Sequence, residues 1–320
     1  MKNKFNAIIL MLPLMLASSF SLGQNFNGPC EKTTATGDII KVSAASGSGS
    51  NEVFRGSADN STTGDACSEI PDAYRVKVFK FGLCSANPFT SNDFSTCSFF
   101  LENDNGVSST IEGALGTKAA LPITSQVAPG EYDYILLILS NSFDIKHTQS
   151  YGSTVYSNPN GSGETSGTTC WSVAHTTAFG NFGSAYDSKG TSSDGGVECG
   201  DAGNAVPAFT TEIFDTMGDS EDTEAFVHTS PSSMSVGGNA MWVKLLQDDN
   251  ATTATSYTNA KRMLVSINTA ATKVVTSSSS LDIKLKLTDA VSIDSSYTDS
   301  KTYIVKLGAD PIQVDVVITN

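Results

Sequence analysis

The sequence of 320 residues is acidic, with 33 Asp and Glu against 19 Lys and Arg and a formal net charge of −14. Nucleic-acid binding is disfavoured, because contact with phosphates requires a positively charged surface and the sequence contains no cluster of Lys or Arg. An acidic surface suits a protein that meets salt or divalent cations, although solubility alone explains the charge more simply.

The N-terminal residues have the pattern of a secretory signal peptide covering 1–23. Lys2 and Lys4 precede an apolar run at 7–16, and the small residues Ser21 and Gly23 suit a cleavage site at the end of this segment. The run is too short to span a hydrocarbon core of about 30 Å. Removal of both lysines would leave a formal charge of −16. We therefore expect an extracellular or cell-surface protein, with the periplasm as a further possibility.

The sequence predicts no membrane anchor in the mature protein. Its most apolar later run, at 134–139, has the length of a strand. There is no cysteine near the predicted cleavage site to accept a lipid, and no hydrophobic C-terminal tail. We expect any attachment to a cell to be non-covalent or to occur through partner proteins, such as other envelope proteins.

Six cysteines follow the predicted signal peptide, and an even number indicates disulfides formed in an oxidising compartment. Their spacing matches no zinc motif. Pairing in sequence order is the simplest prediction, which joins Cys30 to Cys67, Cys84 to Cys97, and Cys170 to Cys199. The middle pair is favoured most, because it would close a short loop between two strand-like segments and stabilise the fold by about 3 kcal/mol.

Short segments rich in Val, Ile, Phe and Tyr, separated by turn residues, predict an all-β protein. Apolar and basic residues alternate at 74–78, as expected for a half-buried antiparallel strand. Phe79, Phe81 and Leu83 then reverse the phase, which indicates a bulge or a strand covered on both faces. The segment 129–139 becomes apolar on both faces and is predicted to be a central strand.

The C-terminal part repeats this pattern. Predicted strands lie at 240–247, 262–268, 281–287, 301–307 and 312–319. The first two are expected to pair around a polar loop, and the last two to be joined by a turn at 308–311. The fold class is therefore all-β, as one or more antiparallel β-sandwiches stabilised by disulfides.

The distribution of cysteines favours two regions, because the last cysteine precedes a Gly- and Asp-rich stretch. The predicted boundary near residue 205 separates a disulfide-bearing β domain at 24–205 from a cysteine-free β-sandwich region at 206–320. One continuous sandwich with a decorated loop is an equal alternative.

Five acidic residues within a ten-residue segment are candidate calcium ligands, because calcium prefers carboxylate and carbonyl oxygens. They are Asp215, Asp219, Glu221, Asp222 and Glu224. Their spacing is not that of an EF-hand, and acidic loops are usually only solvated. Weaker acidic segments at 102–106 and 248–250 are predicted first as hairpin turns.

Aromatic residues provide a second candidate site. An exposed Trp171 flanked by Tyr151, Tyr156 and Tyr186 would form a patch on which sugars stack, although packing of Trp171 against a disulfide is the simpler interpretation. The sequence contains no local motif for a catalytic triad, a nucleotide-binding loop or a zinc hydrolase. We therefore name no catalytic residue.

These observations predict a secreted or cell-surface bacterial protein with a structural or adhesive, non-enzymatic role in an envelope, lattice or appendage. Self-association is a candidate interaction, because a strand at 312–319, or the segment 24–36, could add to a sheet of a neighbouring subunit. The alternative from another class is an extracellular glycan-binding module or a secreted glycan-processing enzyme.

Overall fold

The structure is a computed structural model, and it describes only part of the sequence. The described residues are 29–40, 42–43, 52–53, 66–112, 121, 125–157, 163–178, 196–217, 225–227, 235–236, 239–288, 290–298, 300–310 and 312–319. The predicted signal peptide at 1–23 lies outside them.

The described residues form a β-protein, and the only helical turn among them is a short 3-10 segment, η1 (Ala202–Asn204). The largest sheet has nine strands in the order β10-β12-β7-β4-β6-β15-β14-β13, with β5 on the remaining edge of β4. Its strands are β4 (Ala73–Cys84), β5 (Cys97–Glu112), β6 (Gly130–Ser140), β7 (Ser142–Lys146), β10 (Thr176–Ala178), β12 (Thr210–Ile213), β13 (Ser235–Val236), β14 (Asn239–Leu246) and β15 (Arg262–Val275).

The second sheet has six strands in the order β11-β9-β8-β18-β17-β3, and two further ribbons have two strands each. The six strands are β3 (Ala66–Glu69), β8 (Thr148–Ser157), β9 (Ser166–Ser172), β11 (Val197–Gly200), β17 (Val291–Thr298) and β18 (Lys301–Ala309). The ribbons are β1 (Val42–Ser43) with β2 (Glu52–Val53), and β16 (Ser280–Lys286) with β19 (Gln313–Thr319).

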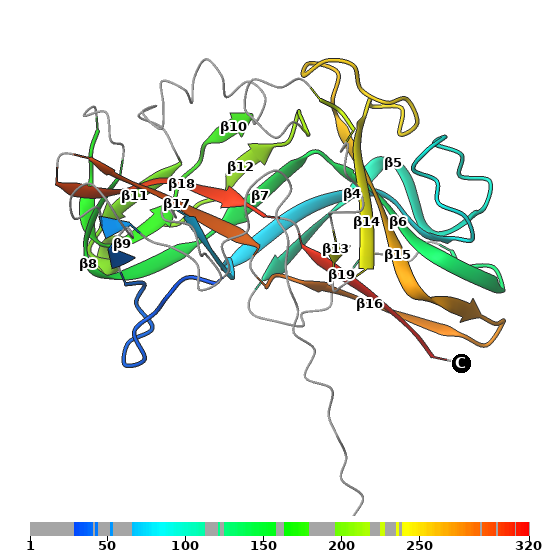
Figure 1. Cartoon of the computed structure of the whole chain (residues 1–320), viewed down its shortest axis with the longest axis horizontal. Helices are drawn as coiled ribbons and strands as arrows, with labels where there is room; N and C mark the ends of the chain where they lie inside the picture. Colours follow the sequence, from blue (N-terminus) through cyan, green and yellow to red (C-terminus); the bar gives the residue numbers. More distant parts are fainter. Residues whose placement is uncertain are drawn as a thin grey trace, which may run out of the picture.

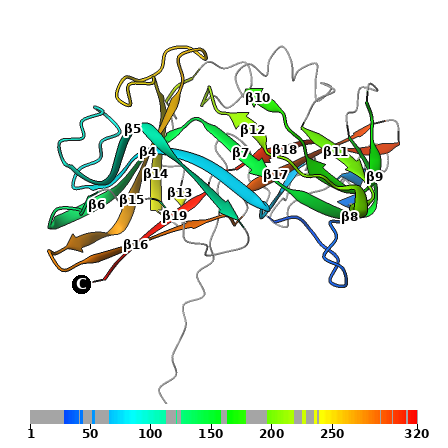
Figure 2. The ribbon, with the colours of Figure 1, turned by 180° about the vertical axis from the view of Figure 1, so that it is seen from behind.

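The arrangement is sandwich-like and mostly antiparallel. In Figure 1 the six-stranded sheet lies on the left, where β18 contacts both β7 and β12 of the large sheet. The other end of the large sheet, with β6, β14 and β15, lies on the right above the β16–β19 ribbon, and Figure 2 shows the same order from behind. The expectation of purely antiparallel sheets is wrong at two places, because β10 pairs with β12 and β8 pairs with β18 in parallel.

Strand β4 connects the two ends of the molecule. Its first residues pair with β7 on one side, and its residues from Val78 onward pair with β6 on that same side. The change of neighbour lies between Arg75, the last residue paired with β7, and Val78, the first paired with β6. The register then shifts against both β5 and β6 at Phe79. The bulge predicted from the reversed apolar phase is therefore confirmed. The predicted central strand is also confirmed, because β6 is hydrogen-bonded to β4 and β15.

One apolar core runs through both ends of the fold. It includes Tyr74 and Val76 of β4, Leu137 of β6, Ile304 of β18 and Leu285 of β16. A smaller cluster lies on the other face of the large sheet, around Leu136, Ile138 and Leu264. The strands at the centre of the large sheet are therefore apolar on both faces, as their sequences predict.

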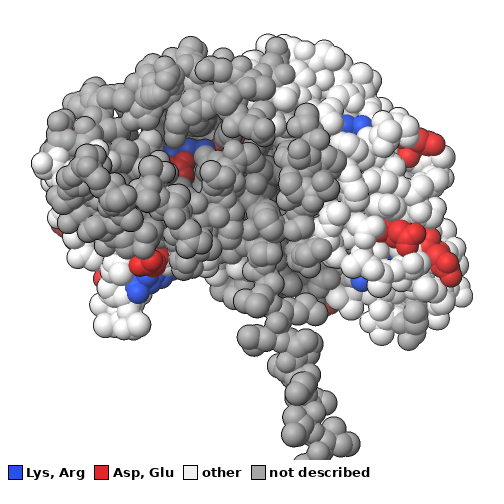
Figure 3. Space-filling view, viewed as in Figure 1, with Lys and Arg blue, Asp and Glu red and all other residues white. Residues whose placement is uncertain are grey.

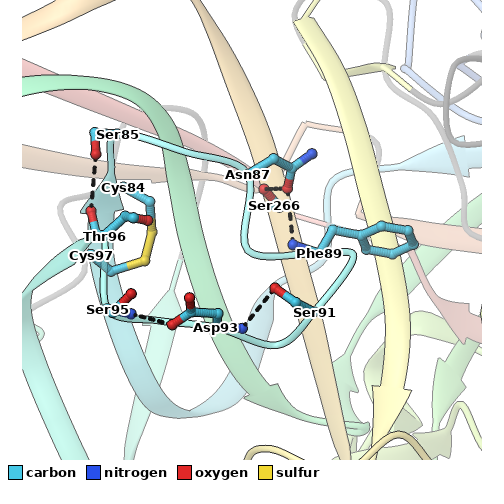
Figure 4. Close-up of a disulfide and its surroundings, with 10 residues drawn as sticks. All are labelled: Cys84, Ser85, Asn87, Phe89, Ser91, Asp93, Ser95, Thr96, Cys97 and Ser266. Atoms are coloured by element: carbon cyan, nitrogen blue, oxygen red, sulfur yellow. Dashed lines mark hydrogen bonds between the residues drawn. A yellow bond between two sulfur atoms is a disulfide. The ribbon is translucent and has the colours of Figure 1, made fainter.

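The loop between β4 and β5, residues 85–96, covers this second face (Figure 4). The hydroxyl of Ser266 on β15 donates to Asn87 Oδ1 at 2.9 Å, and the same oxygen accepts the Phe89 amide at 3.1 Å. Phe89 projects toward β14, where Lys244 lies 4.8 Å from its ring centroid and donates to the Phe89 carbonyl. The Cys84–Cys97 disulfide at the base of the loop and these contacts hold the loop against this face of the sheet.

The disulfides predicted from sequence order are confirmed. Cys30 is bonded to Cys67, Cys84 to Cys97, and Cys170 to Cys199, and all six cysteines lie in described residues. The Cys84–Cys97 bond joins β4 to β5, and the Cys170–Cys199 bond joins β9 to β11. Three disulfides indicate an oxidising environment.

Two predicted turns differ from the structure. Residues 102–106 do not turn a hairpin but lie within β5, where the register shifts between the pairs Val78–Val107 and Lys80–Glu102. Gly106 adopts φ +69°, so its backbone forms a bulge in a continuing strand. The segment at 308–311 does not join paired strands either, because β18 belongs to the six-stranded sheet and β19 pairs with β16.

Strand pairing crosses the predicted boundary near residue 205. β6 pairs with β15, β3 with β17, and β8 with β18, so both large sheets combine strands from before and after this position. The change from cysteine-rich to cysteine-free sequence therefore does not coincide with a division between sheets.

Closure of the 85–96 loop leads to a stability prediction. The double substitution Cys84→Ala with Cys97→Ala should lower the free energy of unfolding by about 3 kcal/mol, because it frees a loop with a sequence separation of 13. Urea denaturation measures this change. Ser266→Ala, which removes only the contact to Asn87, should cost about 1 kcal/mol. Equal losses in the two variants would contradict a separate role for the covalent closure.

Candidate functional site

The edges of the two large sheets are short or irregular. The terminal strands β10, β13, β11 and β3 contain 3, 2, 4 and 4 residues. The long edge strand β5 is interrupted by the bulge at Gly106 and carries exposed Glu102 and Asp104 beside it. Short strands, bulges and charges all hinder the addition of a foreign strand, so these edges are protected.

The β16–β19 ribbon has a more regular edge along β19. β19 is 7 residues long and pairs with β16 in an unbroken antiparallel register from Gln313 to Thr319. Val316 is buried in the core, whereas Val317 is 37% exposed on the opposite face. Within the described residues, β19 has no ladder partner other than β16. Its sequence QVDVVIT contains no Lys, Arg, Pro or Gly, and Asp315 is its one charged residue.

A buried charged cluster lies between the two large sheets. Lys306 of β18 donates from Nζ to Oε1 of Glu212 on β12, and both side chains are almost fully buried, at 5% and 6% exposed. The other carboxylate oxygen of Glu212, Oε2, accepts the Ala309 amide at 2.6 Å. Burial alone would lower the pKa of Lys306, but the charges of Glu212 and Asp294 outweigh it and raise the pKa.

Asp310 adds a third acidic group to this cluster. Its pKa is raised well above the usual value, first by burial and then by the charges of Glu212 and Asp294. The Ser68 hydroxyl donates to Asp310 Oδ2 at 3.3 Å, and the Tyr74 hydroxyl donates to the Asp310 carbonyl at 3.1 Å. Asp310 is therefore harder to ionise than an exposed aspartate, and groups from β3 and β4 hold it in place.

Gly308 provides the space in which the Lys306–Glu212 pair meets. A Cβ atom at this position would lie 2.8 Å from Lys306 Cε and 3.0 Å from Glu212 Oε2. Any larger residue would push the lysine and the carboxylate apart. The sequence contains one indication of this cluster, Lys306 within the apolar strand at 301–307. Its partner Glu212 lies 94 residues away, so no local sequence pattern could identify it.

His147 is a second buried titratable group, between β7 and β8. Its amide donates to Ser172 Oγ at 3.0 Å, and the Ser172 amide donates to the His147 carbonyl at 2.9 Å. Burial, followed by the nearby charge of Lys32, lowers the pKa of His147 from 6.5 to about 4. The imidazole is therefore neutral at physiological pH.

The predicted calcium segment cannot be assembled from the described residues. Asp219, Glu221, Asp222 and Glu224 lie outside them, and Asp215 is buried, at 5% exposed. Among the described residues, no group of three or more His, Cys, Asp and Glu is placed to hold a metal ion. Calcium binding at 215–224 stays a prediction.

The proposed sugar-stacking patch is not formed by its described members. Trp171 is 6% exposed and Tyr151 is 2% exposed, so neither presents a ring face to solvent. Trp171 packs over Gly200, where a Cβ atom would lie 3.0 Å from the ring. Tyr156 is half-buried and packs against Tyr303 with ring centroids 5.7 Å apart. Tyr186, the fourth predicted member, lies outside the described residues.

The described surface is poor in basic groups. On the face in Figure 3, Lys and Arg appear as small separate groups, and acidic residues gather toward the right-hand side. The described residues include no helix with the length and apolar character needed to cross a bilayer. No family model, curated protein or solved structure matches this sequence. The fold and these sites define a disulfide-bonded, sandwich-like β-protein.

The lowered pKa of His147 predicts an acid-sensitive fold. The unfolded state binds a proton at about pH 6.5, whereas the folded state resists protonation until about pH 4. This residue's contribution to stability is thus present above pH 6.5, and about 3 kcal/mol should be lost as the pH falls to 4.

Urea denaturation of wild type and His147→Gln between pH 4 and 7 measures this contribution, and the variant should show a shallower decline. His175→Gln, at a half-buried position, is the matched control and should retain the wild-type slope. An equally steep decline in His147→Gln would assign the acid sensitivity to other groups.

Proposed function

We propose that this protein is a secreted bacterial structural subunit of the cell surface, with a non-enzymatic role in an envelope, lattice or appendage. The observation that carries the proposal is the outer edge of β19. It is a regular and largely apolar edge in a fold in which the described edges of the two large sheets are short or bulged.

The two edges of the ribbon differ in charge. β16 carries Asp282, Lys284 and Lys286 within 7 residues, and such alternating charges hinder strand addition. β19 carries one charge, Asp315, among four aliphatic residues. An added strand would therefore pair along β19, where backbone hydrogen bonds supply affinity and few side-chain charges must be desolvated.

The proposed occupant of the β19 edge is a second copy of this chain. The ribbon supplies only two strands opposite a sheet in which β4, β6, β15 and β14 lie side by side. Addition of a strand from a second copy would widen this layer and place cross-strand side chains beside the exposed Val317. Self-association in this way suits a protein that serves as a repeating building unit.

Export supports the same proposal. Three disulfides indicate an oxidising environment, and the N-terminal pattern predicts a signal peptide. The glycan-binding alternative has weaker support, because the Trp171 and Tyr151 rings expected to stack on a sugar are buried.

The β19 edge predicts a specific effect of charge on assembly. Val317→Lys places an ammonium group on the edge strand beside an added strand, as natural edge strands do to block pairing, and should weaken self-association about tenfold, or ~1.4 kcal/mol. Val206→Lys is the matched control, because Val206 is 76% exposed in the segment between β11 and β12. Analytical ultracentrifugation of the mature protein measures association, and electron microscopy shows whether filaments or sheets form.

Both measurements are made with added calcium and with chelator, because the acidic segment 215–224 is a candidate calcium site. Association that Val317→Lys weakens and Val206→Lys leaves intact supports the proposal. Strictly monomeric wild-type protein in both conditions, or association unaffected by Val317→Lys, would overturn it.

A further inference from the structure

The Lys306–Glu212 pair differs from the other ion pairs of the described residues in its burial. Its two side chains are 5% and 6% exposed. In the pairs Lys32–Glu69, Arg75–Asp144, Lys80–Glu102 and Lys301–Glu164, at least one side chain is between 35% and 51% exposed. Lys306 and Glu212 are thus the pair from which water is most fully excluded.

The atoms of this pair are arranged for a reaction between them. Lys306 Nζ contacts Glu212 Oε1, while Oε2 of the same carboxyl accepts the Ala309 amide at 2.6 Å. A backbone amide in this position can stabilise negative charge that develops on Oε2 during attack at the carboxyl carbon. Gly308 leaves the lysine stem and the carboxyl in direct proximity.

We propose that Lys306 and Glu212 condense to an intramolecular isopeptide bond, which links β18 to β12 and therefore joins the two large sheets covalently. The inference uses no residue of the β19 edge and does not depend on the proposed self-association.

The reaction is balanced without a cofactor or an oxidant. The lysine ammonium first transfers a proton to Oε1 of the carboxylate that it contacts, which leaves a neutral amine and a neutral acid. Nζ then attacks Cδ of Glu212, and the charge that develops on Oε2 faces the Ala309 amide. A second proton moves from nitrogen to Oε1, the Cδ–Oε1 bond breaks, and one water molecule leaves. The amide nitrogen keeps the third proton.

Condensation would relieve the cost of burying this ion pair. Two buried charges carry a desolvation cost of several kcal/mol each, and condensation replaces them with one neutral amide. The same contact on an exposed pair would stay ionic, since water stabilises both charges and opposes condensation.

The bond would supply a connection that the disulfides do not. Cys84–Cys97 lies within the nine-stranded sheet and Cys170–Cys199 within the six-stranded sheet. Cys30–Cys67 attaches the N-terminal segment to β3. Among the six cysteines, no bonded pair joins the two large sheets, so Lys306–Glu212 would be the covalent tie between them.

Intact-mass measurement of the purified mature protein, reduced and denatured, tests the proposal. The expected mass lies below the sequence mass by one water molecule. Trypsin should fail to cleave after Lys306, and tandem mass spectrometry should find the peptides containing Lys306 and Glu212 joined as one branched species. A full sequence mass together with cleavage after Lys306 would overturn the proposal and leave a non-covalent ion pair.

Two variants assign the mass difference to these residues. The double variant Lys306→Met with Glu212→Leu leaves no stranded buried charge and should recover the full mass expected for its sequence. Lys301→Met, which removes the partly exposed partner of Glu164 on the same strand, should retain the loss of one water. A mass difference that persists in the double variant would place the modification elsewhere and overturn the assignment.

Discussion

The fold depends on one constraint, the continuity of β4 through the bulge at Phe79. The first part of this strand pairs with β7 and the second with β6, so a single backbone belongs to both ends of the molecule. β6 ends at Ser140 and β7 begins at Ser142, so β4 meets these two successive strands along one side while β5 stays on the other. The stacking against β18 and the cover formed by the 85–96 loop both follow from the position of this strand.

The interior combines apolar packing with a small number of charged groups at a defined place. Lys306, Glu212 and Asp310 lie where β12 of one sheet faces β18 of the other. Such groups are costly to bury, so their contacts specify how the two sheets align more strictly than apolar packing alone. The sheet edges differ from one another. Short strands and bulges protect the described edges of the large sheets, whereas β19 is regular.

Local features of the fold were predictable, because they depend on residues close together in the sequence. The bulge after Val78 and the central strand at 129–139 follow from the alternation of apolar residues, and pairing in sequence order was the simplest prediction for the disulfides. The partners of Lys306 and the burial of Trp171 depend on contacts between distant segments. Asn-Gly at 105–106 was misjudged as a hairpin because a positive φ at glycine serves a bulge equally well.

The pairing of distant strands has a consequence for how the protein folds. β3 pairs with β17, where Cys67 lies opposite Ile293. β6 pairs with β15, which lies more than a hundred residues further along the chain. Neither large sheet can be completed until the C-terminal third of the chain is present. Proteins dominated by such non-local contacts fold slowly. The Cys84–Cys97 disulfide, by contrast, closes a local hairpin with a sequence separation of 13, so it needs none of these distant strands.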